Sequence, residues 1–138
     1  MFEWVTKKVR IKMGELLMAV RVVIADDAAF MRMVLKNLMI KNGFEVVAEV
    51  ENGEQAIAAY RVHRPDLMTM DINMPEMDGF QALKEIISED PTAKIIMCSA
   101  VGHEAMVAAA IKAGAKDFVV KPFEAERVID KIRKQTGY

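Results

Sequence analysis

LMTMDINMPEMDG, residues 67–79, passes from a buried strand into a turn at a single carboxylate. The apolar residues 67–70 indicate a strand that ends at Asp71, and turn-forming residues follow it directly. In open α/β sheets, ligands bind in the crevice outside the carboxyl ends of the strands. A carboxylate at this point is expected to take part in binding or catalysis. Asp71 is therefore the leading candidate for a functional residue.

On both sides of this stretch, strand and helix patterns alternate five times from residue 20 onward. Short apolar runs predict strands at residues 21–25, 44–50, 67–71, 94–98 and 116–120. Apolar side chains at helical spacing predict helices at residues 28–42, 54–64, about 80–90, 103–113 and 124–135. In the last helix, Ala125, Val128 and Ile132 are expected to face the sheet. Such an alternation requires right-handed crossovers, so the sequence predicts a three-layer α/β domain with a parallel sheet.

Polar side chains follow four of these five strands. Because the carboxyl ends of parallel strands lie along one edge of the sheet, these side chains are expected to lie close together. The second strand ends apart from this group, at residues 51–52, and is expected at the outside of the sheet. The residues at the shared edge are Asp26, Asp27, Asp71, Ser99 and Lys121.

The three carboxylates at this edge predict a metal ion. Carboxylates that are brought close together repel one another, and a divalent cation relieves that repulsion. Mg²⁺ suits the edge better than Ca²⁺, because it is usually held by one or two carboxylates together with waters and phosphate oxygens. Zinc is disfavoured because no histidine or cysteine stands near the cluster. Both histidines, His63 and His103, are expected at the surface.

Lys121 and Ser99 add a positive charge and a hydroxyl donor at the same edge. A carboxylate nucleophile, a magnesium ion, an ammonium group and a hydroxyl are the parts needed for phosphoryl transfer, and Asp71 would be the phosphate acceptor. These residues also have plain structural interpretations. Asp27 could cap the helix that follows it, and a lysine at a strand end usually faces solvent.

Length and composition indicate one domain. The 138 residues are 53% hydrophobic, and 19 basic against 20 acidic residues leave a net charge of −1. This balance provides no bulk attraction to nucleic acid or to an anionic membrane, so neither is an expected partner. No apolar run reaches the length of a membrane span, and a cytoplasmic monomer is expected. The one cysteine, Cys98, lies in an apolar run and is expected to be structural.

Residues 1–18 differ from the rest of the chain. They carry four basic and two acidic residues and have no sustained hydrophobic period. They are predicted to be an N-terminal extension that is dispensable for the fold or not native, with the domain formed by residues 19–138. Met18 could be the true start, because the first strand follows it almost directly. A docking arm with a basic face is the alternative.

The residues at the sheet edge and the segments around them resemble the receiver domain of two-component response regulators, from about Val20 to the C-terminus. Within that family, the likeness is greatest to the free-standing chemotaxis regulators of bacteria and archaea. The segments that carry it are DDAAFMRMVLKNL, MDINMPEMDG, AKIIMCSA and AIKAGAKDFVVKPF. The resemblance implies a flavodoxin-like fold, with five helices and a five-stranded parallel sheet of order 2-1-3-4-5.

The resemblance also implies the ligands of the metal and the direction of the chemistry. A histidine kinase would pass a phosphoryl group to Asp71. Asp26, Asp27 and Asp71 would surround Mg²⁺ together with the backbone carbonyl of Asn73. Lys121 would contact the phosphoryl group.

A switch is implied as well. The peptide bond between Lys121 and Pro122 would be cis, the hydroxyl of Ser99 would move toward the new phosphate, and the ring of Phe118 would turn inward behind it. An ordinary place in the core is the alternative interpretation of Phe118. Val101 stands two residues beyond Ser99, where the family often has a polar side chain near the attacking water. An apolar side chain there predicts a longer lifetime of the phosphorylated form.

These observations favour a signalling switch over an enzyme. Output is expected through protein contacts, because the chain after the last strand has room for one helix only. The expected partners are a chemotaxis histidine kinase, a flagellar-motor switch protein or an archaeal motility adaptor, and a phosphatase that could reset the switch. A magnesium-dependent phosphatase needs an acid two residues past the nucleophile, and the amide of Asn73 cannot serve. A phosphorelay intermediate shares every site residue and stays open.

Overall fold

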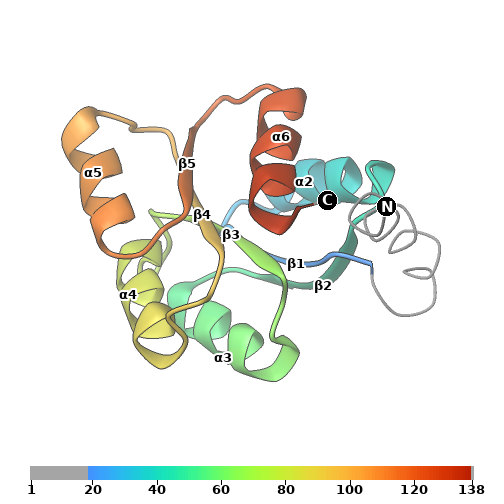
Figure 1. Cartoon of the computed structure of the whole chain (residues 1–138). Helices are drawn as coiled ribbons and strands as arrows, with labels where there is room; N and C mark the ends of the chain where they lie inside the picture. The colour runs from blue at the N-terminus through green and yellow to red at the C-terminus, as the bar shows by residue number, and fades with distance from the viewer. Residues whose placement is uncertain (1–18, 138) are drawn as a thin grey trace.

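Five apolar segments pair side by side as parallel strands in the computed structural model, which describes residues 19–137. The strands are β1 (Arg21–Ala25), β2 (Glu45–Val50), β3 (Leu67–Asp71), β4 (Ile95–Ser99) and β5 (Asp117–Val120). Their order across the sheet is β2-β1-β3-β4-β5 (Figure 1). This order confirms the predicted flavodoxin-like sheet, with β2 at its edge. The predicted extension, residues 1–18, lies outside the described residues.

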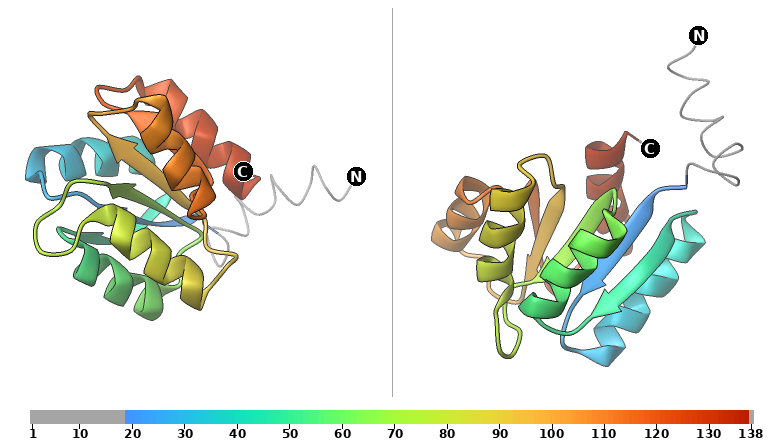
Figure 2. Two further views of the ribbon diagram at one scale, coloured as in Figure 1. Left: turned by 90° about the vertical axis from the view of Figure 1, so that its left-hand side faces the viewer. Right: turned by 90° about the horizontal axis from the view of Figure 1, so that it is seen from below.

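A helix follows each strand, and the helices cover both faces of the sheet (Figure 2). The helices are α2 (Ala29–Lys41), α3 (Gly53–His63), α4 (Gly79–Glu89), α5 (Glu104–Lys112) and α6 (Ala125–Thr136). α2 and α6 pack on one face, and α3, α4 and α5 pack on the other. This is the predicted three-layer arrangement. Among the described residues, no helix is long and apolar enough to cross a membrane.

The alternation of side chains along β3 supplies both cores. Met68 and Met70 are buried in the layer shared with α3, α4 and α5, whereas Leu67 is buried in the layer shared with α2 and α6. Each fully buried side chain of this size contributes about 1.5–3 kcal/mol through its burial. Cys98 is buried in the second layer, in agreement with a structural role. This burial raises the pKa of its thiol to about 12.

The inner face of α6 differs from the predicted one. Val128, Ile129 and Ile132 are buried, but Ala125 is exposed. Helical spacing puts Ala125 on the same face, yet it is the first residue of the helix, and its side chain lies beyond the packed core. The other predicted limits agree to within one or two residues, because predicted first residues such as Ala28 are N-caps.

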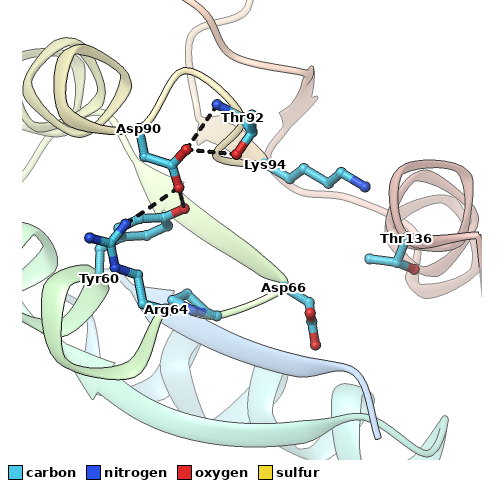
Figure 3. Close-up of a pocket in the computed structure, with 8 residues that line it drawn as sticks. Tyr60, Arg64, Asp66, Asp90, Thr92, Lys94 and Thr136 are labelled. Atoms are coloured by element: carbon cyan, nitrogen blue, oxygen red, sulfur yellow. Dashed lines mark hydrogen bonds and ion pairs between the residues drawn. The ribbon is translucent and has the colours of Figure 1, made fainter. Parts of the chain in front are cut away.

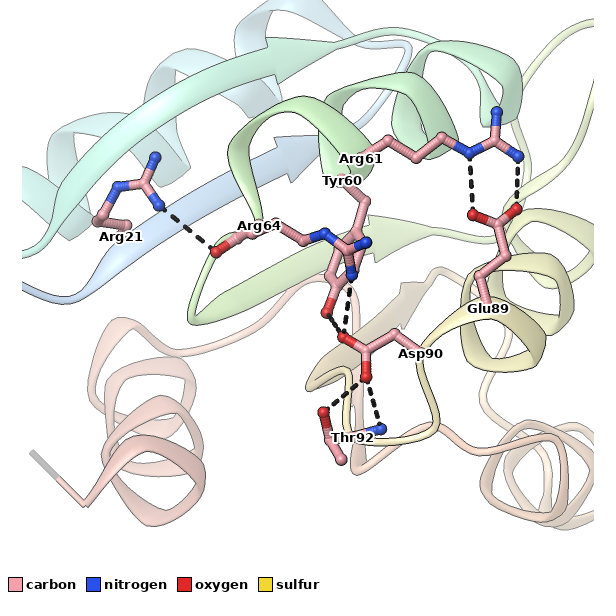
Figure 4. Close-up of polar contacts among 7 residues, drawn as sticks. All are labelled: Arg21, Tyr60, Arg61, Arg64, Glu89, Asp90 and Thr92. Carbon is pink, nitrogen blue, oxygen red and sulfur yellow. Dashed lines mark hydrogen bonds and ion pairs between the residues drawn. The ribbon is translucent and has the colours of Figure 1, made fainter.

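A polar cluster joins α3 to the loop between α4 and β4, at the amino ends of the strands (Figure 4). The carboxylate of Asp90 accepts hydrogen bonds from the hydroxyls of Thr92 and Tyr60, each at 2.6 Å, and lies 3.6 Å from Nη1 of Arg64. The hydrogen bonds from Thr92 and Tyr60 lower the pKa of Asp90. Burial, together with the bond to Asp90, raises the pKa of Tyr60 to about 12. The cluster lines a cavity of about 290 Å³ (Figure 3) and fastens α3 to α4 at the end opposite Asp71.

Candidate functional site

The strand pairing brings four of the predicted site residues to one edge of the sheet. Asp71 is the last residue of β3 and Ser99 the last residue of β4, while Asp26 directly follows β1 and Lys121 directly follows β5. β3 pairs with β1 on one side and with β4 on the other, and β4 pairs with β5. The four side chains therefore stand at the ends of four adjacent strands.

Three carboxylates gather at this edge. Asp26, Asp27 and Asp71 each offer one oxygen atom, and these three atoms lie within 4.8 Å of one another. Asp26 is 1% exposed and Asp71 is 8% exposed, so two of the three charges are largely removed from water. Asp27 is exposed and opens the cluster to solvent. Oxygen atoms at this spacing are able to share one cation.

The ammonium group of Lys121 reaches into the cluster. Its Nζ lies 2.6 Å from Oδ2 of Asp26 and 3.5 Å from Oδ2 of Asp71. The second oxygen of Asp26, Oδ1, accepts the backbone N–H of Ala28 at 2.9 Å. The side chain of Asp26 is therefore held by both Lys121 and Ala28. The carboxylate of Asp71 lies farther from the ammonium group of the same lysine.

Opposing effects act on the charges of this pair. Burial raises the pKa of Asp71, and the charge of Lys121 only partly offsets that rise, since Asp26 and Asp27 add to it. Burial works against the charge on Lys121, but the hydrogen bond to Asp26 and the negative charge of Asp71 outweigh it, so the pKa of Lys121 is raised overall. Lys121 therefore stays charged at neutral pH, and it does not face solvent freely.

Ser99 ends β4 at the same edge as the cluster, whereas Phe118 lies within β5, where it pairs with Met97. Ser99 is fully buried, and its Oγ accepts the backbone N–H of Val101 at 3.1 Å. Phe118 is 7% exposed and packs in the layer with α3, α4 and α5. The peptide bond between Lys121 and Pro122 is cis. The described contacts of Ser99 are thus to its own loop and to β5, with the N–H of Lys121 donating to its carbonyl oxygen at 2.8 Å.

Asp27 does not cap α2, so the structural interpretation of this residue is wrong. The N-cap residue is Ala28, which has no side-chain cap, and the carboxylate that accepts the N–H of Ala28 belongs to Asp26. Both Asp26 and Asp27 contribute an oxygen to the cluster, and Asp26 also stabilises the turn before α2 through its hydrogen bond from Ala28. Asn73, the remaining predicted ligand, is exposed in the loop between β3 and α4.

Sequence reasoning missed two residues next to this site. Asn52, at the end of the β2 loop, donates from Nδ2 to Oε2 of Glu76 at 2.9 Å, which joins the loop after β2 to the loop after β3. The sequence placed residues 51–52 only at the end of the second strand, and Glu76 had no predicted role. The two residues are 24 positions apart, and no local pattern marks such a contact.

Known proteins share both the sequence and the fold. A family model of the response regulator receiver domain matches residues 22–133. The chemotaxis protein CheY of Bacillus subtilis is 64% identical over 117 residues, which are 85% of this chain and 98% of that protein. CheY of Thermotoga maritima is 57% identical over 117 residues, with the same two coverages of 85% and 98%.

A solved structure gives the same result for the fold. CheY of Borrelia burgdorferi, crystallised in a complex with CheX, BeF₃ and Mg²⁺, superposes with a TM-score of 0.81 at 35% identity. The match covers 83% of this chain and 87% of that one. These similarities agree with the strand order, with the acidic cluster at the carboxyl edge and with the lysine that faces it. The chain belongs to the response regulator receiver domain family, and its close relatives are regulators of chemotaxis.

Proposed function

We propose that the chain is a phosphorylation-controlled switch of chemotaxis, in which Asp71 accepts a phosphoryl group from a histidine kinase in the presence of Mg²⁺. The observation that carries this proposal is the position of Lys121, whose Nζ lies 2.6 Å from Asp26 and 3.5 Å from Asp71. One ammonium group faces two buried carboxylates, so it is placed to hold an oxygen of an incoming phosphoryl group. The 64% identity to CheY of Bacillus subtilis supports the same role.

The donor set fits a hard divalent cation. The three clustered carboxylate oxygens lie within 4.8 Å of one another, and Mg²⁺ prefers oxygen ligands of this kind. Asp26, Asp27 and Asp71 would hold the ion together with the backbone carbonyl of Asn73. The bound ion would neutralise charge on the transferred group and orient its oxygens. The relative from Borrelia burgdorferi, crystallised with Mg²⁺, supports this choice of metal.

In the transfer, a carboxylate oxygen of Asp71 forms a bond to phosphorus while the bond from phosphorus to the kinase's histidine nitrogen breaks. The imidazole nitrogen keeps the electron pair of that bond and takes up a proton from solvent. Lys121 supplies positive charge to the phosphoryl oxygens, and the hydroxyl of Ser99 supplies a hydrogen bond. Catalysis of this kind depends mainly on positioning and on charge neutralisation.

The signal then passes to a protein partner. Phosphorylation adds about −1.5 to −2 charge beside Lys121, and this charge favours a conformation with Ser99 drawn toward the phosphate. Ser99 ends β4, and Phe118 lies in β5. A shift at either residue therefore reaches the surface formed by α5, β5 and α6. A flagellar-motor switch protein or an archaeal motility adaptor would read that surface, and a phosphatase would return it to rest. The complex of the Borrelia burgdorferi relative with CheX, BeF₃ and Mg²⁺ supports recognition of this domain by a second protein.

The site is proposed as a phosphate acceptor and not as an enzyme that turns over outside substrates. The residue two positions past Asp71 is Asn73, and an amide cannot protonate a leaving group. A phosphorelay intermediate would use the same residues, but the similarity to chemotaxis proteins favours the chemotaxis role.

The proposal is tested with the purified chain, Mg²⁺ and acetyl phosphate as a small phosphodonor. Intact mass should show one added phosphoryl group in the wild type and none in Asp71→Asn. Beads that carry the chain with beryllofluoride and Mg²⁺ should capture a motility protein that Asp71→Asn does not capture. Steady release of phosphate from phosphomonoesters, abolished in Asp71→Asn, would instead identify a phosphatase. Transfer from the phosphorylated chain to a protein histidine would identify a relay.

A further inference from the structure

The loop that carries Asn73 is anchored at both ends by backbone hydrogen bonds. The N–H of Ile72 donates to the carbonyl of Cys98 on β4 at 3.0 Å, and the N–H of Gly79 donates back to the carbonyl of Ile72 at 2.8 Å. Residues 73–78 between these anchors form a closed loop. Something must also hold the middle of this loop if the carbonyl of Asn73 is to keep one direction.

The middle of the loop is held by the loop that follows β2. Asn52 is 8% exposed, and its side-chain amide is used at both ends. Oδ1 accepts the N–H of Gln55 at 2.8 Å and caps α3, while Nδ2 donates to Oε2 of Glu76 at 2.9 Å. Asn52 therefore links a rigid helix start to the third residue after Asn73.

Two further features show that this contact shapes the backbone. Glu76 has φ of +66°, a left-handed backbone conformation that residues other than glycine rarely adopt. Beside it, the N–H of Gly53 donates to the carbonyl of Met77 at 2.8 Å. A Cβ at Gly53 would lie 2.6 Å from that carbonyl oxygen, so the two loops touch at the backbone. A left-handed residue persists where its surroundings hold it, and here the hydrogen bond from Asn52 and the contact at Gly53 do so.

We propose that Asn52 and Glu76 form a positioning pair for the metal site, which sets the affinity for Mg²⁺ by fixing the direction of the Asn73 carbonyl. The inference rests on the proposed function for the identity of the cation and for the Asn73 carbonyl as one of its ligands. Neither side chain needs to touch the ion. Groups that orient metal ligands in this way typically change metal affinity by about 10-fold to 100-fold when they are removed.

The chain offers a variant that breaks the pair and keeps the cap. Asn52→Asp retains an oxygen for the N–H of Gln55 but replaces the amide donor with a carboxylate that faces Glu76. The double variant N52D/E76Q exchanges donor and acceptor, restores the hydrogen bond and has the net charge of the wild type. Glu76→Gln alone keeps an acceptor for Asn52 and measures the effect of the lost charge. Each variant is titrated with Mg²⁺ by calorimetry, with thermal unfolding as the check of folding.

The added negative charge of Asn52→Asp should by itself tighten the binding of a cation, so a weakening cannot come from charge. We expect Asn52→Asp to bind Mg²⁺ about tenfold more weakly, and N52D/E76Q to return to within about twofold of the wild type. Unchanged or tighter binding in Asn52→Asp would overturn the inference, and so would equal weakening in the single and double variants.

The proposed function is tested separately in the same titrations. A wild type that binds Mg²⁺ and loses it in Asp71→Asn supports the proposed site, whatever the outcome for Asn52. A wild type that binds no Mg²⁺ overturns both the site and the pair. If Asn52→Asp does not fold, Glu76→Ala takes its place. Glu76 is exposed, and removing its side chain leaves the bond from Gln55 to Asn52 that caps α3 intact. Glu76→Ala should then bind Mg²⁺ about tenfold more weakly than Glu76→Gln, and equal binding would overturn the pair.

Discussion

Gly79→Ala should damage both the fold and the metal site, although alanine usually stabilises a helix. Gly79 is the first residue of α4, and a Cβ there would lie 1.9 Å from the carbonyl oxygen of Asp71 and 2.9 Å from its carbonyl carbon. Carbon and oxygen atoms normally approach no closer than about 3.3 Å. The two backbones must therefore separate by more than about 1 Å, and the atoms that must move belong to the proposed phosphate acceptor.

The expected cost follows from these contacts. Overpacking costs about 1–3 kcal/mol, and loss of the 2.8 Å hydrogen bond from Gly79 to Ile72 adds about 0.5–1.5 kcal/mol. The gain of about 1 kcal/mol from replacing glycine in a helix offsets part of this sum. We expect a net loss of about 0.5–3.5 kcal/mol, centred on about 2 kcal/mol, which lowers the melting temperature by about 8 °C in a domain of this size.

Thermal unfolding by circular dichroism and Mg²⁺ titration by calorimetry measure the two effects. Gly137→Ala is the matched control, because Gly137 has φ of +72° but a Cβ there would meet no atom within 4 Å. That variant should lose only about 1 kcal/mol, through backbone strain, and should bind Mg²⁺ normally. If Gly79→Ala unfolds no earlier than Gly137→Ala and binds Mg²⁺ as the wild type does, the reasoning from the close approach to Asp71 is wrong.

Four other changes have defined outcomes. Val101→Glu should shorten the lifetime of the phosphorylated form severalfold, because Val101 is 45% exposed beside the site and a carboxylate there can position water. The loss of acid-labile phosphate over time measures that lifetime. Asp71→Asn should raise the melting temperature of the metal-free protein at pH 7. Because the pKa of Asp71 is raised in the folded state, its carboxyl stabilises the fold at low pH and loses that contribution as pH rises. The difference in melting temperature between Asp71→Asn and the wild type should therefore vanish near about pH 3. Lys121→Met should cost about 3 kcal/mol in urea unfolding without Mg²⁺, because it leaves Asp26 buried without its partner at 2.6 Å. Tyr60 has a pKa of about 12, above its ordinary 10, so the stability difference between wild type and Tyr60→Phe should fall as pH rises from 10 to 12.

Most of the fold and the core of the site were accessible from the sequence because their signals are local or periodic. The strand that ends at Asp71 and the turn after it were visible in thirteen consecutive letters, and β3 was predicted at its observed limits. Parallel strands then place every strand-end residue at the same edge, which is how Lys121 and Asp26 could be grouped across 95 positions of sequence. Helix limits moved by a residue or two, since caps and first helical residues have similar patterns.

Contacts between loops had no such signal. The bond from Asn52 to Glu76 depends on how far two irregular segments extend beyond the sheet, and neither segment has a repeating pattern. The same holds for Asp90, in the loop after α4, which accepts a hydrogen bond from Tyr60 on α3, 30 positions earlier in the chain. Exposure at a helix end is equally hidden, as Ala125 shows, because helical spacing says nothing about where the sheet beneath it stops.

Asn73 and Val101 together determine what the proposed site does after phosphorylation. Asn73 supplies an amide where an enzyme of this chemistry would need an acid, so the site has no group there to drive turnover of outside phosphoesters. Val101 presents an apolar side chain, 45% exposed, on the loop that follows Ser99, where a polar group could otherwise hold the attacking water. With both routes to rapid hydrolysis weakened, the phosphoryl group should persist long enough for a partner to bind. The lifetime of the signal would then depend on a separate phosphatase, and adding such a protein should accelerate phosphate loss more than any single polar substitution at Val101.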